Sequence, residues 1–436
     1  MHFVVNPSPL TGATIEIPGD KSISHRALML AAIADGTSTI SNFLNGEDCL
    51  ATCAAMQAMG VSIETPDERT ARVHGVGMSG LQVPVRPLDL GNSGTGMRLL
   101  AGLLCGQPFD SCLIGDASLS RRPMGRIIEP LERMGARIDG RDGKPPLLIR
   151  GNRKLQRMDY RLPVASAQVK SAILLASLYA SGDCCIVEPT TTRDHTERML
   201  AGMGVGLNQG PDGICMSGSA KIQATDIAVP GDLSSAAFII LGALISGRGE
   251  TRIEGVGMNP TRTGILDILL LMGADIRLEN HRVTGFEPVA DVRINASRLR
   301  GIDVDPGLVS LAIDEFPVLF IAAAVASGRT RFSGIGELRV KESDRIGAMA
   351  SGLRSLGIKV EESPDGAVVH GGKLRGGTVD SFEDHRVAMS FAVAATAATD
   401  PVTIRDVDPV DTSFPGFAAC LRAGGADITV VDSCPA

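Results

Sequence analysis

Basic side chains recur at the predicted helix starts of this chain, where the helix dipole disfavours positive charge. They stand in segments such as PGDKSISHR, SRRP, TTRDH, RVKESDR and EDHR. The residues are Lys21, Arg26, Arg122, Arg193, Lys341, Arg345 and Arg386. A bound phosphate or carboxylate makes this placement favourable, because the helix N–H groups and the cations then both attract the same anion. Each cation alone is better explained by an ion pair with a nearby acid, but the repeated placement of seven predicts a polyanion site.

Other patterns with possible chemistry are weaker. The Ser, Thr, Asn and Asp residues at the same helix starts are expected N-caps. The segment GNSGTG is rich in glycine but lacks both the phosphate-loop and the dinucleotide-binding spacing. His25, His195 and His385 lie in no spacing typical of metal ligands, so we expect no metal.

Composition narrows the class of partner. Hydrophobic residues make up 44% of the 436 residues, aromatic residues 3%, and the formal net charge is -7. These values argue against nucleic acid and anionic membranes as partners. Nine cysteines without a CxxC pair fit free thiols and a cytoplasmic location. No segment resembles a signal peptide or a membrane-spanning helix.

The elements that must position these side chains come from a repeated signature. A short Gly-centred segment follows an amphipathic stretch and precedes alternating apolar and polar residues, which predicts a helix, a C-terminal glycine and a strand. It recurs at intervals of about 70 residues. Its six glycines are Gly60, Gly135, Gly204, Gly273, Gly357 and Gly425.

A second series of helices interleaves with the first and is apolar on nearly every side, as in RALMLAAIADG and AAFIILGALISG. A helix that is apolar all round is buried. The repeated unit is therefore strand, buried helix, strand, outer helix and two further strands. Six such units predict an α/β fold whose buried helices are wrapped by sheet.

An echo between IPGDKS and VPGDLS divides the six units into three and three. Pro-Gly-Asp is also common turn chemistry, so chance remains the alternative. We interpret the echo as two crossings between similar domains, with residues 20–229 in one domain and residues 1–19 and 230–436 in the other.

Taken together, these motifs resemble the 5-enolpyruvylshikimate-3-phosphate synthase family of enolpyruvyl transferases. The strongest are GDKSISHRALMLAAIADG, LGNSGTGMRLLAG, GDASLSRRPMGRIIEPL, SAQVKSAILLA, IDEFPVL, ELRVKESDR and DHRVAMSF, in the family's order and over nearly the whole chain. The resemblance implies a two-domain inside-out α/β barrel. It also implies transfer of enolpyruvyl from phosphoenolpyruvate to the 5-hydroxyl of shikimate 3-phosphate, in the shikimate pathway of aromatic amino-acid biosynthesis, without a cofactor.

The resemblance also assigns residues to both substrates. It makes the first domain the main shikimate 3-phosphate site and the second the source of catalytic carboxylates and phosphoenolpyruvate-binding arginines. The implied shikimate 3-phosphate ligands are Lys21, Ser22, Arg26, Ser166, Ala167, Gln168, Arg193, Asp314 and Lys341. The implied phosphoenolpyruvate ligands are Lys21, Gly94, Arg122, Gln168, Arg345 and Arg386.

By the same resemblance, Asp314 is the base for the 5-hydroxyl, Glu342 the acid and base at the methylene carbon, and Lys21 a proton donor to phosphate. Without it, Asp314 reads as a helix cap and Glu342 as a solvated residue. The chain departs from the family at Thr412, where plant and enteric members carry Lys. Gly94 stands where glyphosate-resistant members have Ala, so we expect glyphosate to compete with phosphoenolpyruvate.

Two alternatives stay open at this level. A UDP-N-acetylglucosamine enolpyruvyl transferase shares the fold and the donor, but carries a reactive Cys that GDASLSRRPMGR lacks. A ring-shaped DNA clamp is also acidic and sixfold repetitive, but would place its cations along helix faces. We expect a monomer acting on small molecules.

Overall fold

The six signature glycines of the sequence all adopt positive φ, between 85° and 104°. This conformation favours glycine and ends a helix by satisfying its last carbonyls. In the computed structural model, which describes residues 1–151, 154–210, 213–218 and 221–432, each of these glycines ends an outer helix. The outer helices are α2 (Glu47–Ala58), α4 (Gly125–Arg133), α6 (His195–Gly202), α8 (Gly264–Leu271), α11 (Arg345–Ser355) and α13 (Phe417–Ala423).

The chain forms two units, which we call the N-terminal unit (residues 19–229 and 284–287) and the C-terminal unit (residues 1–18, 230–283 and 288–436). The crossings fall between Pro18 and Gly19 and between Val229 and Pro230. The sequence analysis placed residues 284–287 with the rest of residues 230–436, but in the structure they belong to the N-terminal unit. Phe286 in this segment packs against the core of the N-terminal unit, and a Cβ on Gly202 would lie 2.2 Å from its ring.

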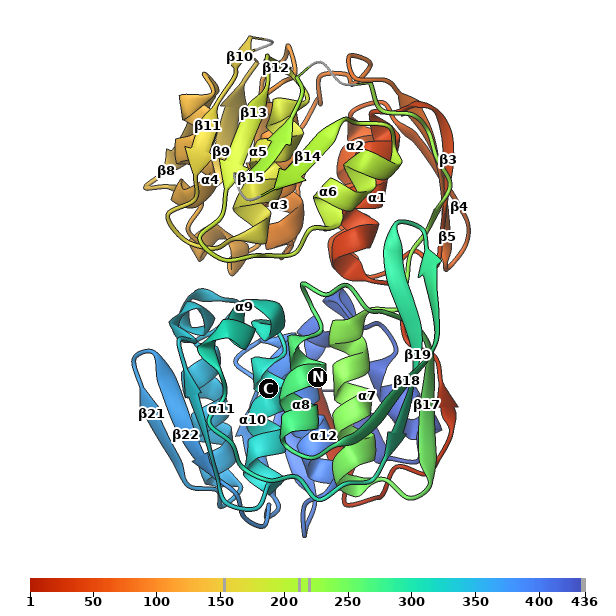
Figure 1. The fold of residues 1–436 in the computed structure, drawn as a ribbon, viewed down its shortest axis with the longest axis vertical. Coiled ribbons are helices and arrows are strands. Elements are labelled where there is room, and N and C mark those ends of the chain that lie inside the picture. The colour runs from red at the N-terminus through yellow and green to blue at the C-terminus, as the bar shows by residue number, and fades with distance from the viewer. Residues whose placement is uncertain (152–153, 211–212, 219–220, 433–436) are drawn as a thin grey trace. The chain divides into compact units, whose positions relative to one another are not determined.

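Each unit contains three nearly fully buried helices, as their apolar sequences predict. In the N-terminal unit α3 packs against α1 and α5, and in the C-terminal unit α7, α10 and α12 pack against one another (Figure 1). The bounds are α1 (Lys21–Ala32), α3 (Gly94–Leu104), α5 (Ala167–Ser177), α7 (Leu233–Ser246), α10 (Phe316–Val325) and α12 (His385–Thr396). A short helix, α9 (Val309–Ala312), precedes α10.

The sheets repeat one strand order. In five of them, a short edge strand runs parallel to the strand that follows a buried helix, and an antiparallel pair completes the sheet. In the N-terminal unit the sheets are β16-β3-β5-β4, β6-β7-β9-β8 and β11-β13-β15-β14, with a small β10-β12 pair. Their strands are β3 (Asp35–Ser41), β4 (Ser62–Asp67), β5 (Thr70–Val76), β6 (Leu88–Asp89), β7 (Ser111–Ile114), β8 (Arg137–Arg141), β9 (Lys144–Arg150), β10 (Leu155–Gln156), β11 (Asp159–Arg161), β12 (Ala180–Ser181), β13 (Cys184–Val187), β14 (Leu207–Gly210), β15 (Gly213–Met216) and β16 (Ile227–Ala228).

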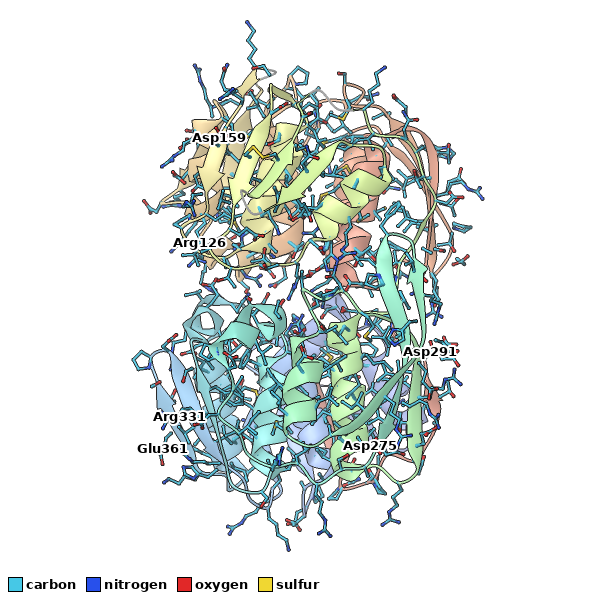
Figure 2. All side chains as sticks on the ribbon, viewed as in Figure 1. Arg126, Asp159, Asp275, Asp291, Arg331 and Glu361 are labelled. Carbon is cyan, nitrogen blue, oxygen red and sulfur yellow. A yellow bond between two sulfur atoms is a disulfide. The ribbon has the colours of Figure 1, made fainter. Side chains whose placement is uncertain are left out.

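In the C-terminal unit the sheets are β18-β19-β17-β2, β20-β22-β21 and β23-β24-β1-β25. Arg331 and Glu361 are exposed on the second of these (Figure 2). The N-terminal strand β1 pairs with both β24 and β25, so it completes the sixth repeat. The strands are β1 (His2–Asn6), β2 (Thr14–Ile15), β17 (Glu250–Gly257), β18 (Asp275–Thr284), β19 (Glu287–Asn295), β20 (Arg329–Ser333), β21 (Val360–Ser363), β22 (Gly366–His370), β23 (Gly377–Asp380), β24 (Val402–Arg405) and β25 (Asp427–Val431).

One prediction about the cysteines is wrong. Cys185 and Cys215 form a disulfide (Figure 2), whereas the sequence favoured free thiols throughout. The two residues stand directly opposite each other on the antiparallel strands β13 and β15, with Cα atoms 4.1 Å apart. This register could not be derived from spacing alone. Cys434 lies outside the described residues.

Candidate functional site

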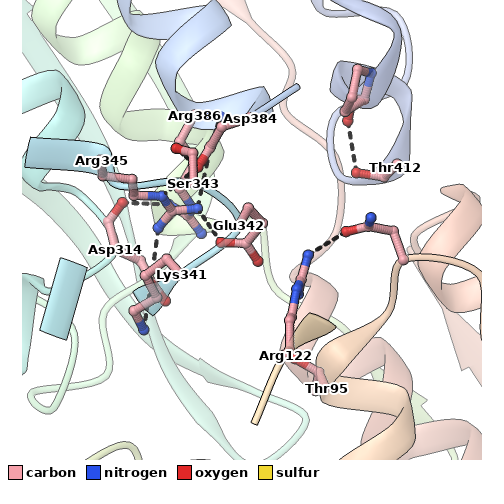
Figure 3. A network of polar contacts seen from close by, with 12 residues as sticks. Thr95, Arg122, Asp314, Lys341, Glu342, Ser343, Arg345, Asp384, Arg386 and Thr412 are labelled. Atoms are coloured by element: carbon pink, nitrogen blue, oxygen red, sulfur yellow. Dashed lines mark hydrogen bonds and ion pairs between the residues drawn. The ribbon is translucent and has the colours of Figure 1, made fainter. Parts of the chain in front are cut away.

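In the C-terminal unit, the predicted residues gather around Arg345, the first residue of α11 and nearly fully buried (Figure 3). Its Nε donates to Asp384 Oδ2 at 2.8 Å, and its Nη2 donates to Glu342 Oε2 at 2.7 Å. The same Nη2 donates to Asp384 Oδ1 at 3.4 Å. Its Nη1 has no hydrogen bond to a described residue and lies 3.6 Å from Asp314 Oδ1. Of the three guanidinium nitrogens, the buried Nη1 is therefore left without a hydrogen-bond acceptor among the described residues.

Electrostatics keep Arg345 cationic in this position. Burial by itself would lower the pKa of its guanidinium, but the three surrounding carboxylates raise it above the ordinary value. The fully buried Asp384 also accepts from the backbone N–H of Arg386 at 2.9 Å and from the hydroxyl of Ser343 at 3.1 Å. One carboxylate thus caps α12 and holds the cation at the start of α11.

Arg386, the second residue of α12, is held through one nitrogen. Its Nη1 donates to the carbonyl oxygen of Asp314 at 2.8 Å and to Glu315 Oε1 at 3.4 Å. Within the described parts of the chain, its Nε and Nη2 make no hydrogen bond. Lys341 Nζ lies 3.4 Å from Asp314 Oδ1. The structure therefore brings Asp314, Lys341, Arg345 and Arg386 together.

In the N-terminal unit, α1 begins with an N-cap by Asp20, which accepts from the N–H of Ile23 at 2.9 Å. Lys21, the first residue of α1, has its Nζ 2.8 Å from Asp48 Oδ2 at the start of α2. The ion pair expected for a single cation thus exists here. The sequence analysis gave Asp48 no role, because nothing in the segment GED indicates which residue it pairs with.

Arg26 is buried one turn further along α1. Its Nη1 donates to the carbonyl oxygen of Ser22 at 2.8 Å, its Nε to Thr196 Oγ1 at 2.7 Å, and its Nη2 to Ser171 Oγ at 2.8 Å. Burial lowers the pKa of Arg26 to about 10, a shift that nearby carboxylates oppose. The side chain is therefore still a cation at neutral pH and fixes the first turn of α1.

The remaining predicted residues of this unit stand at the starts of α3, α4, α5 and α6. Gln168 links two helices: its Oε1 accepts from Arg98 Nη1 at 2.6 Å, and its Nε2 donates to Thr95 Oγ1 at 2.9 Å. Arg122 Nη2 donates to Asn92 Oδ1 at 2.5 Å. Ser166 caps α5, Ala167 begins α5, Gly94 begins α3, and Arg193 is half-buried before α6. Sequence reasoning gave no binding role to Asn92, Thr95 or Arg98, although GNSGTGMR contains all three.

Thr412 stands where plant and enteric members of the resembled family carry Lys, and it contacts its own turn. Its hydroxyl donates to the carbonyl oxygen of Pro409 at 2.7 Å, and its side chain is buried. The hydroxyl is thus satisfied within its own 3-10 turn (Asp408–Thr412).

A buried ion cluster beside α5 was not predicted as a unit. Lys170 Nζ lies 2.8 Å from Glu188 Oε2 and 2.7 Å from Glu197 Oε1, and it donates to the carbonyl oxygen of Thr192 at 3.3 Å. Burial raises the pKa of Glu197, and the cation of Lys170 opposes that shift. The cluster ties α5 to the segment that precedes α6.

The sequence showed no metal spacing at His195, but the fold brings Asp194 and Glu287 to it, with ligand atoms all within 4.8 Å. His195 Nδ1 lies 2.7 Å from Glu287 Oε1. The guanidinium of Arg198 is 2.8 Å from Asp194 Oδ1 and 3.9 Å from Glu287 Oε2. Because the cation of Arg198 already lies beside both carboxylates, we describe the group as an ion cluster that anchors residues 284–287, the turn between β18 and β19.

His25 should make the protein less stable in acid. It is fully buried, with Nδ1 2.8 Å from Thr52 Oγ1 and Nε2 3.3 Å from Ser93 Oγ. Burial and then the cations Lys21 and Arg26 lower its pKa to about 3. The unfolded chain, with a His pKa near 6.5, takes up a proton that the folded chain refuses. This contribution to the free energy of unfolding is therefore fully present above pH 6.5 and is lost as the pH drops from 6.5 toward 3.

The test compares urea unfolding at about pH 7.5 and about pH 5, where this one group removes about 2 kcal/mol. We expect His25→Gln, which keeps polar atoms for both hydroxyls, to remove that part of the pH dependence. An equal loss of stability between the two pH values in both proteins would contradict the expectation.

No described helix has both the length and the hydropathy required to cross a membrane. Residues 4–421 match the family model for EPSP synthase (3-phosphoshikimate 1-carboxyvinyltransferase). A curated relative of that name from Methylococcus capsulatus is 56% identical over 98% of both chains. One from Alkalilimnicola ehrlichii is 54% identical over 99% of this chain and 98% of its own.

Solved structures agree. EPSP synthase from Acinetobacter baumannii superposes with a TM-score of 0.88 at 48% identity, over 98% of this chain and 100% of that one. The enolpyruvyl transferase NikO from Streptomyces tendae shares the fold alone, with a TM-score of 0.79 at 18% identity over 98% of both chains. These matches favour the predicted family over the UDP-N-acetylglucosamine enzyme and the DNA clamp. The chain belongs to the EPSP synthase (3-phosphoshikimate 1-carboxyvinyltransferase) family.

Proposed function

We propose how this chain's residues divide the work of the family reaction, the transfer of enolpyruvyl from phosphoenolpyruvate to the 5-hydroxyl of shikimate 3-phosphate with release of phosphate. As a member of the family, the chain is an enzyme that catalyses this transfer. The observation that carries the assignment is the pair of arginines at the starts of α11 and α12, whose remaining donors suit a dianion.

Phosphoenolpyruvate carries a phosphate and a carboxylate, and both are bidentate acceptors. In our proposal, Arg345 offers Nη1 and Arg386 offers Nε and Nη2, since carboxylates and carbonyls of the protein occupy their other donors. A guanidinium held in this way loses little freedom when an anion binds. In the other unit we assign Lys21, Gly94, Arg122 and Gln168 to the same substrate.

Shikimate 3-phosphate is assigned to the starts of α1, α5 and α6 and to two residues of the C-terminal unit. Exposed backbone N–H groups at a helix start favour a phosphate. Arg26 contributes charge and holds the carbonyl of Ser22, so that the first turn of α1 is already in place. The assigned residues are Lys21, Ser22, Arg26, Ser166, Ala167, Gln168, Arg193, Asp314 and Lys341.

For the chemical steps, we assign Asp314 as the base that takes the proton of the 5-hydroxyl. The freed oxygen attacks C2 of phosphoenolpyruvate while Glu342 protonates C3, which gives a tetrahedral intermediate. Glu342 then removes a proton from C3 as the C–O bond to phosphate breaks, and Lys21 supplies a proton to the phosphate. Two cations lie next to the Asp314 carboxylate, Lys341 Nζ at 3.4 Å and Arg345 Nη1 at 3.6 Å, and a positioned carboxylate can act as a general base.

The direct test is phosphate release from phosphoenolpyruvate with purified protein. We expect release that requires shikimate 3-phosphate and is not supported by UDP-N-acetylglucosamine in its place. Release with the nucleotide sugar, or release that does not depend on an acceptor, would reject the assignment.

Gly94→Ala should weaken phosphoenolpyruvate binding without unfolding the protein. A Cβ at this position would lie 2.9 Å from Arg122 Nη1 and 3.0 Å from Arg98 Nη1, so both flexible side-chain ends must move. We expect KM for phosphoenolpyruvate to rise about tenfold, equivalent to about 1.4 kcal/mol. The melting temperature should stay within about 2 °C, because the neighbours that must yield are side-chain tips.

Glyphosate inhibition gives the second measurement on this variant. If glyphosate competes with phosphoenolpyruvate, its inhibition constant should rise at least as much as that KM. Equal sensitivity of the wild type and Gly94→Ala would contradict this expectation.

A further inference from the structure

A buried polar group joins the starts of the three buried helices of the C-terminal unit. Asp232 stands before α7, Glu315 stands immediately before α10, and Arg386 lies in the first turn of α12. Ser234 and Arg262 complete the group. All except Arg386 are at least nine-tenths buried, and Arg386 is nearly so.

The contacts form a chain that ends at Arg386. Arg262 Nη2 donates to Ser234 Oγ at 2.5 Å and to Asp232 Oδ1 at 3.2 Å. The Ser234 hydroxyl donates to Glu315 Oε1. That same oxygen lies 3.4 Å from Arg386 Nη1. The chain balances two cations against two carboxylates.

Glu315 is not required as a cap. It occupies the N-cap position of α10, yet its side chain accepts no hydrogen bond from the helix backbone. A buried carboxylate is costly to desolvate, and an apolar residue in its place is often neutral or stabilising. Its side chain instead faces two cations, Arg386 Nη1 at 3.4 Å and Arg262 Nη2 at 3.9 Å. Arg386 Nη1 also donates to the carbonyl oxygen of Asp314. Two consecutive residues therefore fix one nitrogen of this guanidinium from two sides.

We infer that Glu315 is a positioning residue that sets the orientation of Arg386 toward the phosphoenolpyruvate anion. The inference rests on the proposed function, in which Arg386 binds that substrate. Anchoring Nη1 directs the remaining donors, Nε and Nη2, to one side. Without the anchor, the guanidinium samples other rotamers, and binding must then restrict it.

The main variant is Glu315→Gln, which keeps an acceptor for the Ser234 hydroxyl but removes the charge that faces Arg386. We expect KM for phosphoenolpyruvate to rise about tenfold. The kcat and the KM for shikimate 3-phosphate should stay within about twofold, because the other assigned groups are not altered. A purely structural role would lower the active fraction and leave both KM values in place.

A double-mutant cycle with Arg386→Gln isolates the coupling. If Glu315 acts through Arg386, Glu315→Gln should add less than about twofold once the guanidinium is gone. Ser234→Ala is the second variant in case Glu315→Gln does not fold. It removes the hydroxyl that holds Glu315 Oε1 in place. It should raise the same KM by about threefold.

Two results would overturn the inference: equal changes in both KM values, or multiplicative effects of Glu315→Gln and Arg386→Gln. Calorimetric titration with phosphoenolpyruvate separates this inference from the reaction itself. If the wild type releases no phosphate but Glu315→Gln still binds phosphoenolpyruvate more weakly than the wild type, the proposed reaction is rejected. The positioning role of Glu315 is then retained.

Discussion

Asp314→Asn should lower kcat by about a thousandfold, within the range for loss of a general base. The amide has nearly the same shape but cannot take the proton of the acceptor hydroxyl. The substitution also removes the negative charge next to Lys341 Nζ, 3.4 Å away, and Arg345 Nη1, 3.6 Å away. Both cations then attract anionic substrates at least as strongly as before, so KM for phosphoenolpyruvate should not rise.

Steady-state kinetics with both substrates varied measure this effect. Asp303→Asn is the matched control, because it removes an exposed carboxylate from the same unit and should leave kcat unchanged. A variant of Asp314 that keeps more than about a tenth of kcat, or whose KM for phosphoenolpyruvate rises as kcat falls, would show that the carboxylate does not act as the base.

Asp384→Ala should destabilise the protein by about 3–5 kcal/mol, the usual cost when one partner of a buried ion pair is removed. Asp384 is fully buried, and Arg345 depends on it for hydrogen bonds of 2.8 and 3.4 Å. The variant also deprives the N–H of Arg386 of its cap and the hydroxyl of Ser343 of its acceptor. Urea unfolding near neutral pH measures the loss.

Two companion variants identify the cause. Asp384→Asn keeps one oxygen for the cap and should cost less than Asp384→Ala, although its amide NH2 no longer accepts from Arg345 Nε or from the Ser343 hydroxyl. Replacing the cation as well, in Asp384→Ala with Arg345→Met, should recover part of the stability, since no unpaired charge then remains buried. The buried pair does not stabilise the fold in this way if Asp384→Ala lowers the free energy of unfolding by under about 1 kcal/mol. The same conclusion follows if Arg345→Met lowers it further by as much as Asp384→Ala does.

The repeated architecture could be predicted from the sequence because it rests on local signals. Two features can be recognised within single short segments: the glycine that follows each outer helix and the apolar run of each buried helix. The sequence likewise predicted that the N-terminal strand joins the C-terminal half of the chain. The cations at helix starts were found because they contradict the helix dipole.

The pairing of those cations could not be predicted. Arg345 and Asp384 are 39 residues apart, and Lys21 and Asp48 are 27 apart. Which acid reaches which cation depends on how neighbouring helices are rotated and shifted, which no local pattern encodes. The hairpin tip at 284–287 is a similar case, because His195 and Glu287 are 92 residues apart.

The central place of β1 in its sheet has a consequence for biosynthesis on the ribosome. Residues 2–6 of this strand are translated long before its two neighbours, β24 and β25, which begin at residues 402 and 427. Residues 2–6 therefore stay without their strand partners until β24 and β25 have been synthesised. The N-terminal unit, by contrast, has all of its segments once residue 287 has emerged. Nascent-chain folding should therefore be ordered, with this unit maturing first and the other completing its fold only once β25 has emerged.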